Sequence, residues 1–255
     1  MTDTRSHTAL VLGGSSGLGR ASAAALLAAG SRVLVTSRDA GRAAEVAREL
    51  GAGASGIALD LADPAAIAAA LPELAGLEID QLVLNSGGPA PSTASELTTE
   101  ALRTAMEQLL FAHITLTKAL LPGMLENGWG RIVAIGSSGV QSPIPTLAVS
   151  NIGRAALAAY LKSLAGDVAD RGVTVNMVLP GRIATARVAA LDEAAARKSG
   201  RSPDEVAAQS AARIPANRYG DPAEFGAAVS FLASEQAAYI TGEQLRVDGG
   251  MVGSY

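Results

Sequence analysis

The chain has 255 residues, 49% of them hydrophobic, and a formal net charge of -4. This length and composition predict one α/β domain over residues 1–255, and the scattered arginines lack the basic patch of a nucleic-acid binder. There is no cysteine, and the two histidines are His7 and His113, the second expected on a helix face. Disulfides and thiolate chemistry are therefore excluded, and no metal site or Ser-His-Asp triad is expected.

The chain shows no sign of membrane insertion in its residue pattern. Its start, MTDTRSHTALVLGG, has no long apolar leader segment, and no uninterrupted apolar run is long enough to span a bilayer. We therefore expect a soluble cytoplasmic protein that binds a small-molecule substrate and has no nucleic-acid or membrane partner.

Short β-rich runs alternate with longer, alanine-rich helical stretches along the whole chain. The alternation predicts a Rossmann-type, doubly wound α/β fold, with a seven-stranded parallel sheet and helices on both faces. The predicted strands are residues 8–12, 32–36, 56–59, 81–85, 131–135, 173–179 and 243–247.

The segment 182–216 differs from the other connections because it carries several charges between the sixth strand and a turn at 217–221. Two interpretations remain open for it. It is either a mobile lid over a substrate or an ordinary helical hairpin on the surface.

Residues 13–19 read GGSSGLG, between the first predicted strand and a predicted helix at 20–29. Glycines permit a tight turn and a close approach of the backbone, and a helix N-terminus offers free amide donors to a pyrophosphate. Similar turns also occur for purely structural reasons. The candidate binding loop consists of Gly13, Ser15, Ser16, Gly17, Leu18 and Gly19.

Five segments in matching order and spacing resemble the short-chain dehydrogenase/reductase family over residues 8–250. Gly13, Gly17 and Gly19 match its Gly-x-x-x-Gly-x-Gly, with Leu12 in place of a bracing threonine. Asp60, at the end of the third strand, matches the family aspartate that contacts the adenine. Residues 84–87 read LNSG where the family has Asn-Asn-Ala-Gly. The segments PGRIAT at 180–185 and YITG…VDGG at 239–250 complete the pattern.

The resemblance implies a nicotinamide dinucleotide cofactor and assigns residues to it. Asp60 and Leu61 are expected at the adenine. The residues expected along the rest of the cofactor are Asn85, Ser86, Gly87, Pro180, Gly181, Ile183 and Thr185.

The end of the second strand favours NADP(H) over NAD(H). An acidic residue there would bind both ribose hydroxyls of NAD and repel a 2′-phosphate. This chain has Ser37 and Arg38 instead, a hydroxyl and a guanidinium that suit a phosphate. Arg42, one helical turn later, either assists them or is a solvated helix charge.

Residues 131–138, RIVAIGSS, resemble the family strand that ends in the active-site serine, which corresponds to Ser137, with Ser138 as its nearest rival. From there the register places Ser150 on the family tyrosine and Arg154 on the lysine, so that Tyr-x-x-x-Lys becomes Ser-x-x-x-Arg. Leu109 stands where the family has a catalytic asparagine.

This substitution removes the family's proton donor, since a serine is a far weaker acid than a tyrosine of pKa about 10. Ser137, Ser150 and Arg154 can still stabilise an alkoxide while water delivers the proton, and Arg154 can bind the ribose.

No nearby residue of the same helix replaces the missing pair. Tyr160 lies about 15 Å beyond Ser150 along the helix, and Lys162 lies about 12 Å beyond Arg154, and both separations are too large. Tyr219 and Arg182 lie in segments that can fold toward the substrate.

Three functions follow from this pattern. The first is an NADP(H)-dependent oxidoreductase that acts on a small carbonyl or imine, including 3-oxoacyl compounds. The second is a non-redox enzyme, such as a dehydratase or isomerase, and the third is a catalytically silent cofactor-binding subunit in which Arg154 serves an internal salt bridge. The resemblance also implies a homotetramer formed through the helices at 98–127 and 147–170, where small alanines allow close approach.

Overall fold

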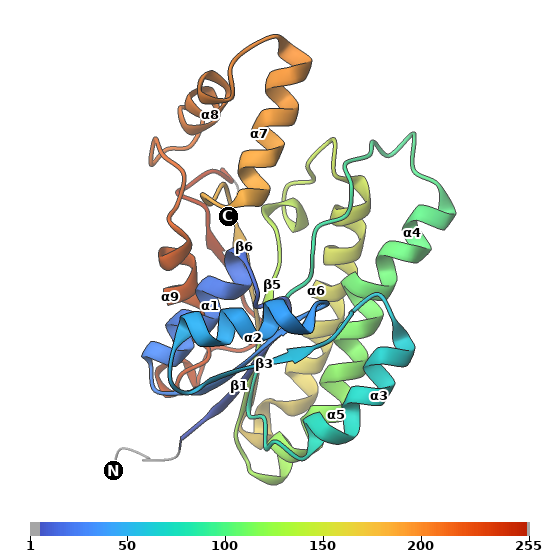
Figure 1. Ribbon diagram of the computed structural model, residues 1–255, viewed down its shortest axis with the longest axis vertical. Helices are drawn as coiled ribbons and strands as arrows, with labels where there is room; N and C mark the ends of the chain where they lie inside the picture. Colours follow the sequence, from blue (N-terminus) through green and yellow to red (C-terminus); the bar gives the residue numbers. More distant parts are fainter. Residues whose placement is uncertain (1–5, 254–255) are drawn as a thin grey trace.

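The computed structural model describes residues 6–253. Residues 1–5, which begin the N-terminal stretch considered above, and residues 254–255 lie outside this description. Seven parallel strands form one sheet in the order β3-β2-β1-β4-β5-β6-β7 (Figure 1). The predicted doubly wound α/β architecture is confirmed.

All seven predicted strands are present, with ends that differ from the prediction by at most two residues. β1 lies between β2 and β4 in the sheet, and its Val11 is in register with Val35 of β2 and Val83 of β4. The strands are β1 Thr8–Val11, β2 Arg32–Ser37, β3 Ala54–Ala58, β4 Gln81–Leu84, β5 Gly130–Ile135, β6 Val173–Pro180 and β7 Gln244–Val247.

Helices cover both faces of the sheet. The α-helices are α1 Gly17–Ala28, α2 Ala40–Leu50, α3 Pro64–Ala75, α4 Thr99–Met106, α5 Ala112–Glu126, α6 Ala148–Val168, α7 Ala186–Ser199, α8 Pro203–Ala211 and α9 Pro222–Leu232. A π-helical turn, Glu107–Phe111, joins α4 to α5, and short 3-10 turns lie at Ser138–Val140, Ala169–Arg171 and Glu235–Ala237.

The core divides into two layers because successive side chains of a strand point to opposite faces. Leu10 and Leu12 pack on the side of α3, α5 and α6, whereas Ala9 and Val11 pack on the side of α1, α2 and α9. Each strand is therefore apolar on both faces, as a parallel sheet between two helical layers requires.

One helical stretch, Thr99–Glu126, is long and apolar enough by length and composition to cross a membrane. It comprises α4, the π-helical turn and α5, and it is interrupted by charged residues such as Lys118. Leu116, Leu120 and Met124 from this stretch are buried in the core of the sheet. Its packing is that of a core helix in a doubly wound domain.

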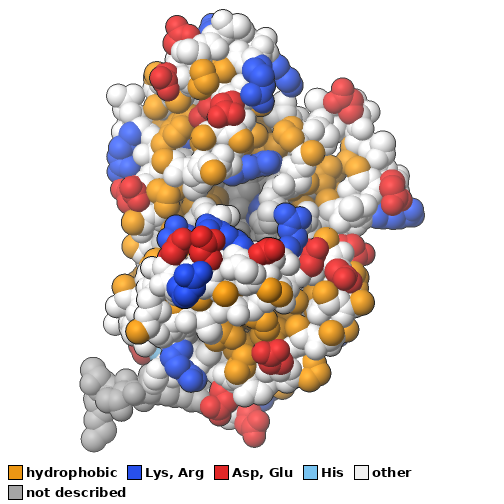
Figure 2. All heavy atoms as spheres, in the orientation of Figure 1, with side chains coloured by type: hydrophobic (Ala, Val, Ile, Leu, Met, Phe, Trp, Pro, Cys, Tyr) orange, Lys and Arg blue, Asp and Glu red, His pale blue; other side chains and the backbone are white. Residues whose placement is uncertain are grey.

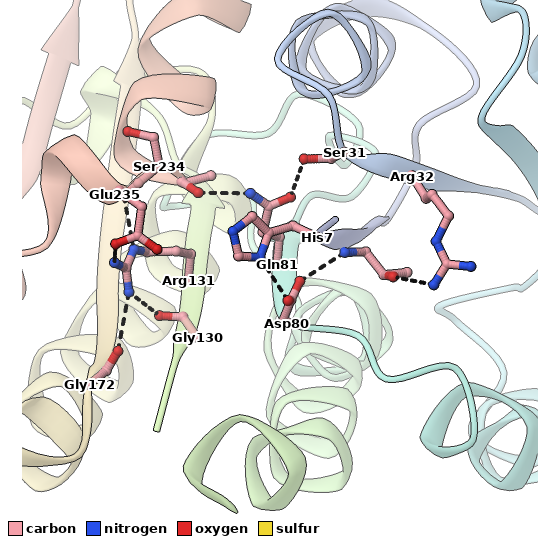
Figure 3. A network of polar contacts seen from close by, with 12 residues as sticks. His7, Ser31, Arg32, Asp80, Gln81, Gly130, Arg131, Gly172, Ser234 and Glu235 are labelled. Atoms are coloured by element: carbon pink, nitrogen blue, oxygen red, sulfur yellow. Dashed lines mark hydrogen bonds and ion pairs between the residues drawn. The ribbon is translucent and has the colours of Figure 1, made fainter. Parts of the chain in front are cut away.

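A polar network joins the strands at their amino ends (Figure 3). The Arg131 side chain on β5 is only 2% exposed and donates to the carbonyl oxygens of Gly130, Gly172 and Ser234 at 2.9, 3.2 and 3.0 Å. Its guanidinium also lies 4.4 Å from the centre of the Trp129 ring. The network therefore ties β5 to the segments before β6 and after α9.

Asp80 extends the same network to β1. Its carboxylate accepts a hydrogen bond from the Thr8 amide at 2.9 Å and lies 2.8 Å from Nδ1 of His7. The His7 ring stacks on Trp129 at 3.9 Å. These contacts occupy the amino ends of the strands, opposite the edge at which the predicted site residues lie.

Candidate active site

The glycine-rich loop between β1 and α1 has the backbone geometry that its glycines permit. Gly13 and Gly17 adopt positive φ angles of 56° and 52°, a region that favours glycine. A Cβ at Gly19 would clash with the carbonyl oxygen of Gly13. No side chain of the described residues caps the start of α1. The backbone N–H groups of its first turn are therefore available to donate hydrogen bonds to a ligand.

Two side chains from other strands brace this loop. Thr36 of β2 accepts a hydrogen bond from the Gly13 amide at 2.9 Å, and Asn85 donates to the carbonyl oxygens of Leu12 and Gly13 at 3.2 Å each. The loop is therefore held without the threonine that Leu12 replaces. The part played by Thr36 was not predicted, because it depends on the pairing of β1 with β2.

Arg38 and Ser37 lie at the carboxyl end of β2. Arg38 is exposed and forms no hydrogen bond or ion pair with any residue from 6 to 253, so its guanidinium is available to a ligand. The Ser37 hydroxyl accepts only a long bond from the Asp39 amide at 3.4 Å. Arg42, by contrast, pairs with Glu45 at 2.7 Å, which favours its interpretation as a helix charge.

The remaining predicted cofactor residues lie along the same edge of the sheet. Asp60 accepts a bond from the Ala62 amide at 2.9 Å, and the neighbouring Leu61 is buried. Gly87 is exposed, whereas the Ser86 hydroxyl is buried and has no hydrogen-bond partner in the described part of the chain. Of the polar residues after β3 and β4, Asn85 contacts the glycine-rich loop directly.

The segment after β6 reaches across to the glycine-rich loop. A Cβ at Gly17 would lie 3.9 Å from the Thr185 methyl group, so the two segments face each other. Pro180 ends β6, the Gly181 amide donates to Val247 at 3.0 Å, and Ile183 is buried. The structure therefore brings the predicted cofactor residues of five strand ends to one edge of the sheet.

Ser137, Ser150 and Arg154 lie in the 3-10 turn and the helix α6 that follow β5. Ser137 caps the 3-10 turn that follows β5, and its hydroxyl accepts from the Gly139 amide at 3.0 Å. Ser150 lies in the first turn of α6, with a hydroxyl that has no hydrogen-bond partner among residues 6–253. One turn later, Arg154 donates to the carbonyl oxygen of Ile135, the last residue of β5, at 2.6 Å.

Arg154 is a buried cation. Arg154 is only 8% exposed. Its burial lowers the pKa of its guanidinium to about 10, and the positive charge of Arg187 makes a smaller contribution in the same direction. The guanidinium therefore stays protonated at neutral pH. No carboxylate of the described residues lies within ion-pair distance, so the internal salt bridge considered for Arg154 is absent from this part of the chain.

Behind Arg154 lies a second buried titratable group, His113. It lies in α5, in agreement with its expected place on a helix face, and it is only 1% exposed. Its Nδ1 lies 3.2 Å from the carbonyl oxygen of Leu109. Burial, followed by the charge of Arg154, lowers the pKa of His113 to about 4. Leu109, in the position of the family asparagine, is itself buried in the π-helical turn.

This histidine makes stability depend on pH. Because its folded pKa lies below the unfolded value of 6.5, its contribution is complete above pH 6.5 and is lost as the pH falls toward 4. The loss at pH 4 is about 3 kcal/mol. The free energy of unfolding should be measured with urea for wild type and His113→Gln across this pH range. The difference between the two proteins should become smaller as the pH falls. Parallel pH profiles for the two proteins would contradict the assignment.

The other aromatic and cationic candidates are engaged elsewhere. Lys162 donates to the Gly242 carbonyl oxygen at 2.9 Å, and Tyr160 packs against the core. Tyr219 donates to Asp192 at 2.8 Å, and Arg182 pairs with the same carboxylate at 2.8 Å. Neither of these last two side chains is free to replace the missing tyrosine.

The segment 182–216 forms a helical hairpin, α7 and α8, that stands above the carboxyl edge of the sheet (Figure 1). The buried carboxylate of Asp192 in α7 binds the side chains of Arg182, before the hairpin, and Tyr219, after it. These contacts hold the hairpin where it joins the rest of the domain. Figure 2 shows a hollow between this upper part and the sheet, with Lys and Arg side chains as well as Asp and Glu side chains around it.

A doubly wound parallel sheet with a glycine-rich loop between β1 and α1 is typical of dinucleotide-binding proteins. Residues 13–252 match the family model described as Enoyl-(Acyl carrier protein) reductase. The chain belongs to this family, the short-chain dehydrogenases/reductases.

Individual relatives agree with this assignment. The 3-oxoacyl-acyl-carrier-protein reductase FabG of Salmonella typhimurium is 37% identical over 247 residues, which are 95% of this chain and 96% of that protein. The structure of YwfH, an NADPH-dependent reductase of bacilysin biosynthesis, superimposes with a TM-score of 0.93 at 29% identity, covering 98% of this chain and 100% of YwfH. The L-sorbose reductase of Gluconobacter frateurii with NADPH and L-sorbose gives 0.92 and 29%, covering 98% of each chain.

Proposed function

We propose that the protein is an NADPH-dependent reductase of a small carbonyl compound that works with a Ser-x-x-x-Arg site. The observation that carries this proposal is the environment of Arg154. Its guanidinium is buried, charged and held by one bond to Ile135, and it lies one helical turn from the unengaged hydroxyl of Ser150. A cation and a donor in a cleft beside a dinucleotide site suit a developing alkoxide.

In the proposed reaction, NADPH supplies a hydride when it is bound. Ser137 and Ser150 donate hydrogen bonds to the substrate oxygen, and Arg154 stabilises its negative charge while water delivers the proton. A general acid contributes about 10² to 10⁴-fold, and a well-placed oxyanion donor about 10² to 10³-fold. The donors can therefore offset much of the loss of a tyrosine.

Two kinds of relatives guide the choice of substrate. The FabG proteins carry the name 3-oxoacyl-acyl-carrier-protein reductase, and the L-sorbose reductase was crystallised with a sugar. The shared feature is a ketone or aldehyde carbonyl. We therefore propose reduction of a small carbonyl, or of an imine of similar shape, and test it by NADPH oxidation over a panel of such compounds.

NADP(H) is the proposed cofactor, bound in preference to NAD(H) through Ser37 and Arg38. Arg38→Ala should remove a charge-assisted contact to the 2′-phosphate and weaken NADPH binding by about 10- to 100-fold, with little change for NADH. Fluorescence titration of both cofactors measures the two dissociation constants. Equal affinities for NADPH and NADH in wild type would contradict the preference, and Arg48→Ala on the neighbouring helix is a matched control.

The assembly is proposed to be a soluble, cytoplasmic homotetramer. Phe111 and Ile152 are large apolar side chains that are 48% and 40% exposed, and they lie on the helical stretches expected at the subunit contact. Their burial against a second copy would remove apolar surface from water. Sedimentation at micromolar concentration should show a tetramer, and a stable monomer would contradict the proposal.

We also propose that the α7–α8 hairpin acts as a lid over the substrate within a single domain. Its position above the carboxyl edge supports this, and its attachment through Asp192 supplies a fixed base about which the outer part can move.

A further inference from the structure

The two serines proposed to bind the substrate oxygen are connected by a loop that has little regular structure. Ser137 caps the 3-10 turn that follows β5, and Ser150 is the third residue of α6. Residues 141–147, between the turn and the helix, contain no helix and no strand of the sheet. The relative positions of the two hydroxyl groups therefore depend in part on the contacts that hold this loop.

The side chain of Asn151 binds the middle of the loop. Asn151 directly follows Ser150 in α6, and its Nδ2 donates to the carbonyl oxygen of Ile144 at 2.9 Å, while its Oδ1 accepts from the Ile144 amide at 3.4 Å. Ile144 lies between Pro143 and Pro145, which have no backbone N–H. The carboxamide thus binds both backbone groups of one residue, which requires a donor and an acceptor on the same side chain.

The same carboxamide contacts the turn that holds Ser137. The Ser137 hydroxyl accepts a hydrogen bond from the Gly139 amide at 3.0 Å. A Cβ at Gly139 would lie 3.2 Å from that hydroxyl oxygen and would clash with Oδ1 of Asn151. The glycine therefore lets the carboxamide approach the turn closely, and Asn151 contacts both the turn and the loop that follows it.

A backbone contact fixes the end of the loop against the segment after β4. The Ser92 amide donates to the carbonyl oxygen of Thr146 at 3.0 Å, and the Ser92 carbonyl oxygen accepts from the Ala148 amide at 3.1 Å. At the start of the loop, the Gln141 side chain forms an exposed bond of 3.4 Å to β7. The contact with Asn151 is therefore the main side-chain restraint on the loop.

We propose that Asn151 is a positioning residue that holds Ser137 and Ser150 in the arrangement in which both hydroxyl groups donate to one substrate oxygen. This inference rests on the proposed function and adds a residue to it. A displacement of about 1 Å can cost about 10²-fold in rate, so a restraint on the loop matters for turnover. The glycine-rich loop is braced by Thr36 and Asn85 instead, so NADPH binding should not depend on Asn151.

The test compares Asn151→Ala with Asn176→Ala as a matched control. The carboxamide of Asn176 in β6 forms the same kind of contact with the segment before β7, since it donates to the Ile240 carbonyl oxygen at 2.7 Å and accepts from the Glu243 amide at 3.0 Å. NADPH fluorescence titration gives the concentration of cofactor sites, and steady-state kinetics with a carbonyl compound that wild type reduces gives kcat per site. Asn151→Ala should lower kcat by about 10- to 100-fold and leave the NADPH dissociation constant unchanged. Asn176→Ala should leave both unchanged.

Two further measurements examine the contact itself. The amide of Ile144 should exchange its hydrogen faster in Asn151→Ala than in wild type, as followed by mass spectrometry. Asn151→Asp keeps the shape of the side chain but has no donor for the Ile144 carbonyl oxygen at neutral pH, so it should also lower kcat. This variant provides the test if Asn151→Ala does not fold.

An unchanged kcat in both variants of Asn151, an equal loss in Asn176→Ala, or unchanged exchange at Ile144 overturns the proposal. Failure of the proposed function gives a different result, namely a wild type that reduces no compound of the panel. That result would overturn the positioning role together with the reaction that it serves.

Discussion

Replacing Arg154 with alanine should lower NADPH-dependent turnover by about 10² to 10³-fold and weaken cofactor binding in the same variant. The reason is that one buried cation is proposed to serve both the ribose and the alkoxide. Arg154 is bonded to Ile135 at the carboxyl end of β5, whereas Arg131 of the same strand is bonded at the amino edge of the sheet. Ser150→Ala should cost only about tenfold, because Ser137 remains as a donor.

Steady-state kinetics with NADPH titrations separates these effects. Arg154→Lys keeps a positive charge and should retain part of both properties, which controls for simple loss of packing. A larger loss in Ser150→Ala than in Arg154→Ala would show that the serine, rather than the cation, dominates the reaction.

Replacing Arg131 with methionine should destabilise the fold by about 3 kcal/mol, since it leaves buried carbonyl oxygens without their donor. The side chain is 2% exposed and holds Gly130, Gly172 and Ser234 together at the amino edge of the sheet (Figure 3). Burial lowers the pKa of Arg131, and the charges of Glu235, 3.7 Å away, and of Asp80 oppose this effect. Its stabilising effect therefore comes mainly from its bonds to the backbone.

The measurement is urea unfolding at one protein concentration. Arg32→Met provides the control, because Arg32 lies at the same edge but is exposed and makes one bond to Thr8 at 2.9 Å. Its loss should cost less than about 1 kcal/mol. Equal destabilisation by the two substitutions would contradict the role assigned to Arg131.

The positions of the strands along the chain and the class of the fold could be predicted because both depend on local patterns. Apolar runs alternate with alanine-rich stretches, and each run became a strand. The least accurate boundary was that of β3, an edge strand that begins at Ala54. Its Ala, Ser and Gly residues lack the β-branched pattern that marks the central strands.

The site residues that follow a motif could be predicted from spacing, which assigns Ser137, Ser150 and Arg154 to the region after β5. Contacts that depend on the tertiary structure could not be predicted. Thr36 braces the glycine loop only through the pairing of two strands, and the burial of His113 depends on which face of α5 meets the sheet.

Arg187 belongs to the segments that were expected to enclose the substrate, but its partner was not predicted. Its bond to the carbonyl oxygen of Pro89 depends on the placement of α7 against the loop after β4.

The most direct test of the central claim compares wild type with the double variant Ser150→Tyr, Arg154→Lys, which restores the family's tyrosine and lysine. Both proteins are assayed for NADPH oxidation over one panel of small ketones, imines, 3-oxoacyl thioesters and oxo acids. We predict that wild type reduces at least one compound and that the double variant loses most of that activity. An inactive wild type with an active double variant would show instead that the native chain is a silent or repurposed member of the family.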